Sequence, residues 1–145
     1  MFGHILVPTD CTDETKNSLD IAVKMQSLEK DQEPDQRITL LHVIETIVDD
    51  DDTQEFERFY TTLTKRAEKK MHQLCAGYPE FQENISILVL LGSRVAEILN
   101  FVQEQGVDLI LLNSHRIDLE NPTKGWGTIS YKVGILAPCP VMLVK

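Results

Sequence analysis

The 145 residues include 42% hydrophobic residues, which suffices for one compact core of ordinary domain size. The 23 acidic residues outnumber the 14 basic residues, and the formal charge of −9 repels the phosphates of nucleic acids and of anionic membrane surfaces. No apolar stretch reaches the ~20 residues that a membrane-spanning helix needs. We therefore expect one domain over residues 1–145, with neither a nucleic acid nor a membrane as its partner.

The beginning of the chain and its cysteines both bear on the compartment. The first residues lead directly into an apolar run, without the basic segment and cleavage site of a secretion signal. Cys11, Cys75 and Cys139 are odd in number and widely spaced, which is typical of neither a disulfide framework nor a zinc site. We expect a cytoplasmic protein without a bound metal.

In chain order, residues 5–7 form an apolar run that Pro8 ends, and apolar residues at three- and four-residue spacing then predict a helix. Thr12 or Asp13 is suited to cap this helix, which should begin near residue 13. Residues 38–44 are almost continuously apolar, as in a strand covered on both faces of a parallel sheet. The acidic run 49–52 suits the N-terminus of a long second helix better than a metal site.

The second half repeats the pattern. Residues 85–91 predict a third strand, and Gly92 and Ser93 start a helix that Gly106 ends. Residues 107–112 predict a fourth strand, residues 125–136 a last helix and residues 141–144 a fifth strand. Alternating strands and helices indicate an α/β fold with a doubly wound, five-stranded parallel sheet and four helices. Ligands bind such sheets beyond the carboxyl ends of the strands.

Four segments carry a more specific signal: ILVPTD (5–10), LLHVI (40–44), GVDLI (106–110) and APCPV (137–141). In this order they resemble the successive signatures of the universal stress protein family. The resemblance implies strand order 3-2-1-4-5, in an adenine nucleotide hydrolase-like fold. It also implies a homodimer in which the terminal strands, here Val141 to Val144, pair antiparallel, and the binding of ATP or AMP.

The phosphate-binding loop departs from the family pattern. ATP-binding members of the family carry Gly-x2-Gly-x9-Gly-Ser/Thr after the fourth strand, whereas this chain has Asn113 and Arg116 at the first two glycine positions and one extra residue before Gly127-Thr128. Glycine permits positive φ and lets backbone N–H groups approach phosphate oxygens. Because this degenerate loop keeps the last glycine and adds an arginine, we expect AMP and ATP to bind within about tenfold of each other.

By resemblance, Pro8, Thr9 and Asp10 contact the base and ribose, and Val43 lines the adenine pocket. The residues at the phosphate end are Asn113, Ser114, Arg116, Gly127, Thr128, Ile129 and Ser130. A carboxylate such as Asp10 can accept ribose hydroxyls, but it can also stabilise a turn. The start of the last helix can attract an anion or be an ordinary helix start.

No catalytic residues emerge from the sequence. His115 could transfer protons, but no partner nucleophile is identifiable, and no Gly-x4-Gly-Lys phosphate loop occurs. The missing motifs argue against an enzyme, and the family resemblance implies a stress-response module with an adenine nucleotide as its optional ligand. The alternative is a nucleotide-hydrolysing enzyme of the same architecture.

Overall fold

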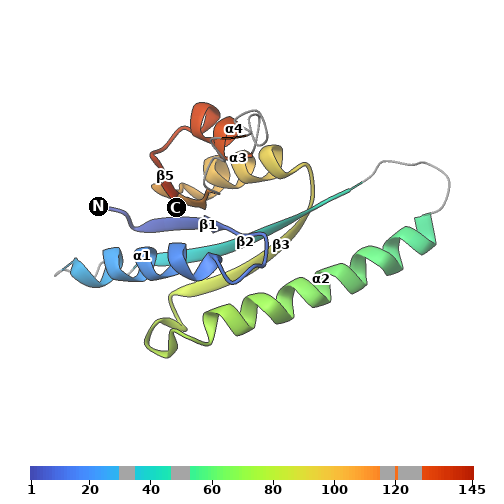
Figure 1. Cartoon of the computed structure of the whole chain (residues 1–145), viewed down its shortest axis with the longest axis horizontal. Helices are drawn as coiled ribbons and strands as arrows, with labels where there is room; N and C mark the ends of the chain where they lie inside the picture. Colours follow the sequence, from blue (N-terminus) through green and yellow to red (C-terminus); the bar gives the residue numbers. More distant parts are fainter. Residues whose placement is uncertain (30–34, 47–52, 115–119, 121–128) are drawn as a thin grey trace.

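The computed structural model describes residues 1–29, 35–46, 53–114, 120 and 129–145. Within them, five parallel strands form one sheet in the order β3-β2-β1-β4-β5, which confirms the predicted fold class (Figure 1). The strands are β1 (His4–Pro8), β2 (Arg37–Glu45), β3 (Ile85–Gly92), β4 (Leu109–Asn113) and β5 (Val141–Val144). The four α-helices are α1 (Thr15–Leu28), α2 (Thr53–Cys75), α3 (Arg94–Gln105) and α4 (Ile129–Leu136), and a 3-10 helix spans Pro79–Phe81.

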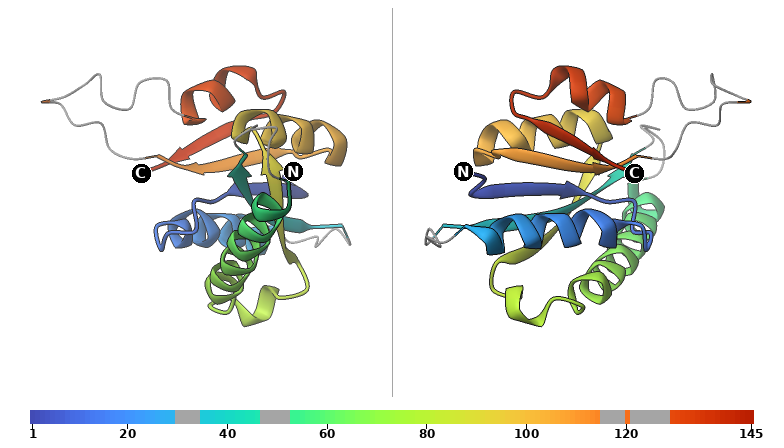
Figure 2. Two further views of the ribbon diagram at one scale, coloured as in Figure 1. Left: turned by 90° about the vertical axis from the view of Figure 1, so that its right-hand side faces the viewer. Right: turned by 60° about the vertical axis from the view of Figure 1, so that its left-hand side comes forward.

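The helices form one layer on each face of the sheet. Helices α1 and α2 cover one face, and α3 and α4 cover the other (Figure 2). Side chains of the central strands alternate between these layers, because successive residues of a strand point to opposite faces. In β4, Leu109 and Leu111 join the cluster under α1 and α2, whereas Ile110 and Leu112 join the cluster under α3 and α4.

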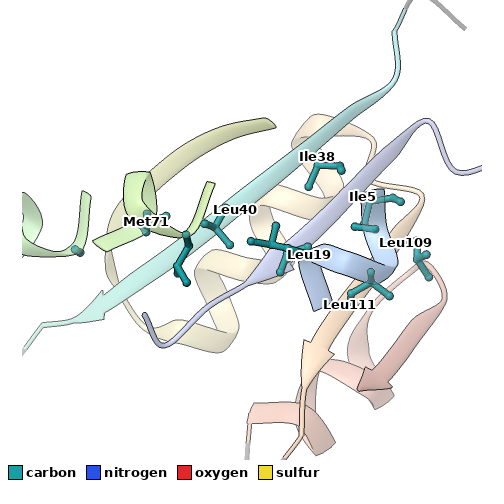
Figure 3. Close-up of a cluster of buried hydrophobic side chains, with 11 residues drawn as sticks. Ile5, Leu19, Ile38, Leu40, Met71, Leu109 and Leu111 are labelled. Carbon is teal, nitrogen blue, oxygen red and sulfur yellow. The ribbon is translucent and has the colours of Figure 1, made fainter. Parts of the chain in front are cut away.

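The cluster under α1 and α2 links segments that are far apart in the sequence. Leu19 of α1 and Met71 of α2 pack onto Ile5 and Leu40 of the sheet, and all four side chains are fully buried (Figure 3). Burying such a side chain contributes about 1.5–3 kcal/mol, so this layer anchors both helices. The strand ends are thereby fixed relative to one another.

Helix α1 begins differently from the prediction, and the expectation of a side-chain cap is wrong. The helix starts at Thr15, without a side-chain cap. The Thr12 hydroxyl instead donates to Asp10 Oδ1 at 2.6 Å, and Asp13 forms an ion pair with Lys70 at 2.8 Å. The N–H of Thr15 donates to the Thr12 carbonyl at 3.2 Å, so a tight backbone turn leads into the helix.

The end of α3 confirms the role predicted for Gly106. This residue has φ of 61° and ψ of 47°, and its N–H donates to the Val102 carbonyl. Glycine adopts this left-handed conformation without the Cβ clash of other residues. Strand β4 begins at Leu109, two residues later than predicted. Just before it, the N–H of Asp108 donates to the carbonyl of His4 at 2.9 Å.

Among the described residues, no helix is both long enough and apolar enough to cross a bilayer.

The end of the sheet at which the strands begin contains a buried histidine. His4 is 4% exposed and packs edge-on against the Phe101 ring, with 5.9 Å between the two ring centroids. Its Nδ1 donates to the Gln105 carbonyl at 3.2 Å, because a carbonyl oxygen can only accept, and its Nε2 then accepts from the Thr39 hydroxyl at 2.8 Å. Both partners fit the neutral ring. Burial lowers the pKa of His4 below 6.5.

We expect this histidine to make stability fall in mild acid. The unfolded chain protonates His4 near its ordinary pKa of 6.5, whereas the folded protein resists protonation, so the contribution of the neutral ring is lost as the pH falls below that value. His4→Gln removes the titration. In urea unfolding, the stability difference between wild type and His4→Gln should therefore shrink from about pH 7.5 to about pH 5.5. A difference that stays constant or grows over this range would contradict the assignment.

Candidate functional site

A cavity of about 240 Å³ opens at the edge of the sheet where the parallel strands end. It is lined by Pro8, Thr9, Asp10, Leu41, Val43, Arg94, Ile98, Leu112, Asn113, Ile129 and Ser130. These residues come from β1 and the turn after it, from β2 and β4, and from the N-terminal halves of α3 and α4. Strand order reverses at β1, whose neighbours are β2 on one side and β4 on the other. Such a reversal creates the crevice in which doubly wound sheets bind ligands.

The floor of the cavity is apolar and its rim is polar. Pro8, Leu41, Val43 and Leu112 are buried strand residues, and Ile98 of α3 is 3% exposed. The polar side chains of the lining are those of Thr9, Asp10, Arg94, Asn113 and Ser130. An apolar floor with a few polar groups at its margin suits a flat heterocycle with polar substituents.

Thr9 directly follows β1 and is bonded at all three of its polar groups. Its N–H donates to the Leu41 carbonyl at 2.8 Å, and its carbonyl accepts from His42 Nδ1 at 2.7 Å. Its hydroxyl accepts from the Cys11 N–H at 2.9 Å and shares a 2.6 Å hydrogen bond with the Thr15 hydroxyl. The protein therefore uses the Thr9 hydroxyl to hold the turn that carries Asp10.

Asp10 lies on the exposed rim and organises the same turn. Its Oδ1 accepts from the N–H of Thr12 at 3.0 Å and from the Thr12 hydroxyl at 2.6 Å. The next residue, Cys11, has φ of 65°, which bends the chain sharply after Asp10. Burial, and then the charge of Asp10, raise the pKa of the Cys11 thiol to about 11, so the thiol is protonated at neutral pH. The turn thus presents one carboxylate in a defined orientation.

Asn113 ends β4, and its side chain is held by α1. Ser18 is fully buried, and its hydroxyl donates to Asn113 Oδ1 at 2.5 Å. Because Oδ1 accepts this bond, the Nδ2 group of the amide can donate elsewhere. Where the family pattern has glycine, this chain therefore brings an oriented amide to the cavity.

The other residues predicted for the site have different positions. Ser114 does not line the cavity; its N–H donates to the Val144 carbonyl at 2.8 Å, and its hydroxyl accepts from Lys145 Nζ at 3.1 Å. Arg116, Gly127 and Thr128 lie outside the described residues. Seven predicted residues thus meet in one cavity: Pro8, Thr9, Asp10, Val43, Asn113, Ile129 and Ser130.

Arg94 is a lining residue that was not predicted from the sequence. This residue is the first of α3, is half-buried and lines the cavity. A signal was available, because Arg94 follows Gly92 and Ser93 at the end of β3 and therefore lies at the same edge of the sheet. In the part of the chain that the structure describes, no group of three or more His, Cys, Asp or Glu residues could hold a metal ion.

Comparisons with known proteins agree with this architecture. The family model described as Universal stress protein family matches residues 1–145. Universal stress protein YxiE of Bacillus subtilis (strain 168) is 28% identical over 154 residues, with 100% of both chains covered. The chain is therefore similar to this relative along its whole length.

Three solved structures share the fold at low sequence identity. The hypothetical protein MJ0577 has a TM-score of 0.72 at 22% identity, covering 100% of this chain and 96% of that one. A universal stress protein in complex with cAMP has a TM-score of 0.62 at 14% identity, covering 99% and 97%. The universal stress protein from Archaeoglobus fulgidus in complex with dAMP has a TM-score of 0.58 at 14% identity, covering 99% and 98%.

The bond between Ser18 and Asn113 predicts a measurable coupling between α1 and β4. Ser18→Ala leaves Asn113 Oδ1 without its buried donor, whereas in an Asn113→Ala background the same change removes no bond. We expect a coupling free energy of about 1 kcal/mol from a double-mutant cycle in urea. Ser27→Ala, on the exposed side of α1, is the control and should show no coupling to Asn113→Ala. Equal costs of Ser18→Ala in the two backgrounds would show that the bond does not form.

Proposed function

The chain belongs to the universal stress protein family, and from this premise we propose that it is a non-enzymatic stress-response module that binds an adenine mononucleotide. The proposed protein is one cytoplasmic domain over residues 1–145. The observation that carries the proposal is the convergence of the predicted site residues on one cavity at the C-terminal edge of the sheet. The two relatives solved with cAMP and dAMP support the class of ligand, because both ligands are adenine nucleotides with a single phosphate.

The proposed placement of the ligand follows the polarity of the cavity. The adenine ring lies on the apolar floor beside Val43 and Ile98. Asp10, on the rim, accepts hydrogen bonds from the ribose hydroxyls. The phosphate lies toward Ile129 and Ser130, because the N–H groups at the start of α4 and the helix dipole attract an anion.

Asn113 gives the altered phosphate loop a new chemical character. Glycine offers a phosphate only its backbone N–H, whereas the Asn113 amide can donate from a side chain that Ser18 orients. One side-chain amide can bind a single phosphate, but it offers too few donors for the triphosphate of ATP. This supports the expectation that AMP and ATP bind with similar affinity.

Binding without turnover is proposed in preference to nucleotide hydrolysis. Of the hydroxyls in the lining, that of Thr9 is bonded within the turn, and the Asp10 carboxylate takes part in the same turn. Both groups thus hold the turn after β1, which argues against either of them acting as a nucleophile. Incubation with ATP and magnesium tests this: the protein should release no phosphate above a buffer blank. Release of many phosphates per protein molecule would establish the hydrolase instead.

The role of Asp10 predicts a selective loss of affinity. Removing the bonds from a ribose to a carboxylate should cost about 1.5–3 kcal/mol, so Asp10→Ala should weaken AMP binding about tenfold or more in calorimetry. Asp13→Ala is the matched control, because Asp13 is an exposed acid in the same turn and pairs with Lys70 outside the cavity. Unchanged affinity in Asp10→Ala would place the ribose elsewhere.

We also propose that two copies associate through β5. In the described part of the chain, β5 pairs only with β4 and leaves its other edge open. Met142 and Leu143 of β5 are 36% and 45% exposed, and Ile135 and Leu136 of the adjoining α4 are 62% and 59% exposed. An apolar edge strand beside an apolar helix surface invites pairing with a second copy.

A charge in the open edge should separate the copies. Leu143→Glu places a carboxylate on the proposed interface, and we expect light scattering at micromolar concentration to show a monomer where wild type is a dimer. Leu28→Glu changes a leucine of α1 that is more exposed, at 71%, and should leave the dimer intact. A monomeric wild type, or dissociation by both variants, would count against pairing through β5.

A further inference from the structure

A second cavity, of about 420 Å³, adjoins the first. Val43 and Arg94 line both cavities, so the two are neighbours at the same edge of the sheet. From there the second cavity extends past Glu45 at the end of β2 to the middle of α2, where Leu63 and Arg66 line it. The two cavities therefore form one groove, which runs across the end of the sheet from α4 to α2.

Two arginines line the second cavity. Among the described residues, its charged lining consists of Arg66, Arg94 and the carboxylate of Glu45. Between the described residues, no ion pair joins either arginine to a carboxylate. The Cys11 thiol also lines the cavity and is protonated at neutral pH, so it adds no negative charge. In a chain with a formal charge of −9, two arginines at one cavity indicate a local site for an anion.

The strand order separates this anion site from the start of α4. Val43 belongs to β2 and Arg94 follows β3, both on one side of β1, whereas Asn113 ends β4 on the other side. The groove thus offers donors to an anion at both ends and an apolar floor between them. A nucleotide with all its phosphates on one side of the ribose can use one end only.

We infer that the second cavity is a subsite for a second phosphate of an adenine nucleotide, attached away from its 5′-phosphate. This inference rests on the proposed function, since it takes the adenosine to lie in the first cavity. The ligand class is that of nucleoside bisphosphates, which carry one phosphate on the 5′-oxygen and one on a ribose 2′- or 3′-oxygen. A guanidinium suits the second phosphate because its planar fork of N–H donors matches two phosphate oxygens at once.

The experiment compares nucleotides that differ in the position of the second phosphate. AMP, ADP, adenosine 3′,5′-bisphosphate and its 2′,5′ isomer are titrated separately into the full chain in a calorimeter. We expect at least one bisphosphate to bind at least about tenfold more tightly than AMP. ADP has the same number of phosphates, but its affinity should exceed that of AMP by less. Arg66→Gln should abolish the tighter binding of the bisphosphate and leave AMP affinity unchanged. The reason is that Arg66 lines the second cavity but not the first.

Arg58→Gln is the matched control, because it removes an exposed arginine of α2 that does not line the cavity. This variant should keep the bisphosphate gain. The inference is overturned if AMP binds but neither bisphosphate binds more tightly than ADP. It is also overturned if the bisphosphate keeps its higher affinity in Arg66→Gln, or loses it equally in Arg58→Gln. Absence of binding for all four nucleotides would overturn the proposed function as well, so the two failures are distinguishable.

Discussion

Strand β1 has hydrogen-bonded neighbours on both of its edges and buried side chains on both of its faces. Its register with β2 runs from His4 opposite Arg37 to Pro8 opposite Leu41, and Ile5 and Leu6 pair with β4. All five of its residues are buried. A strand enclosed in this way cannot slip by one residue without turning its apolar side chains to the wrong layer. The position of its last residue is therefore determined by the core.

This constraint accounts for where the candidate site lies. Because β1 stops at Pro8, the turn that follows emerges between the ends of β2 and β4, where the helices on one face leave a crevice. The bonds from Thr9 to Leu41 and His42 fasten the turn to β2, and the bond from Ser18 to Asn113 fastens α1 to β4. The opposite end of the sheet closes differently, around a buried, neutral His4. The strands thus position the candidate site at one end of the sheet and the polar contacts of His4 at the other.

Much of the fold could be predicted from the sequence, because hydrophobic periodicity and glycine positions are local signals. The five strands and the end of α3 at Gly106 follow from such patterns, and the strand order followed from family resemblance. Contacts between distant side chains leave no such pattern. Ser18 and Asn113 are 95 positions apart, and nothing local distinguishes Ser18 from any other serine of a helix. Arg66 and Arg94 likewise line one cavity although their helices, α2 and α3, cover opposite faces of the sheet.

The central claim is that adenosine binds where the strands end. The most direct measurement is a titration of the isotope-labelled protein with AMP, followed by backbone amide chemical shifts in NMR spectra. The account predicts that the largest shifts fall on Thr9, Asp10, Val43, Asn113 and Ser130, which line the first cavity. Shifts concentrated instead on Gly3, Arg37 and Gly106, which line a polar cavity of about 630 Å³ at the other end of the sheet, would contradict it.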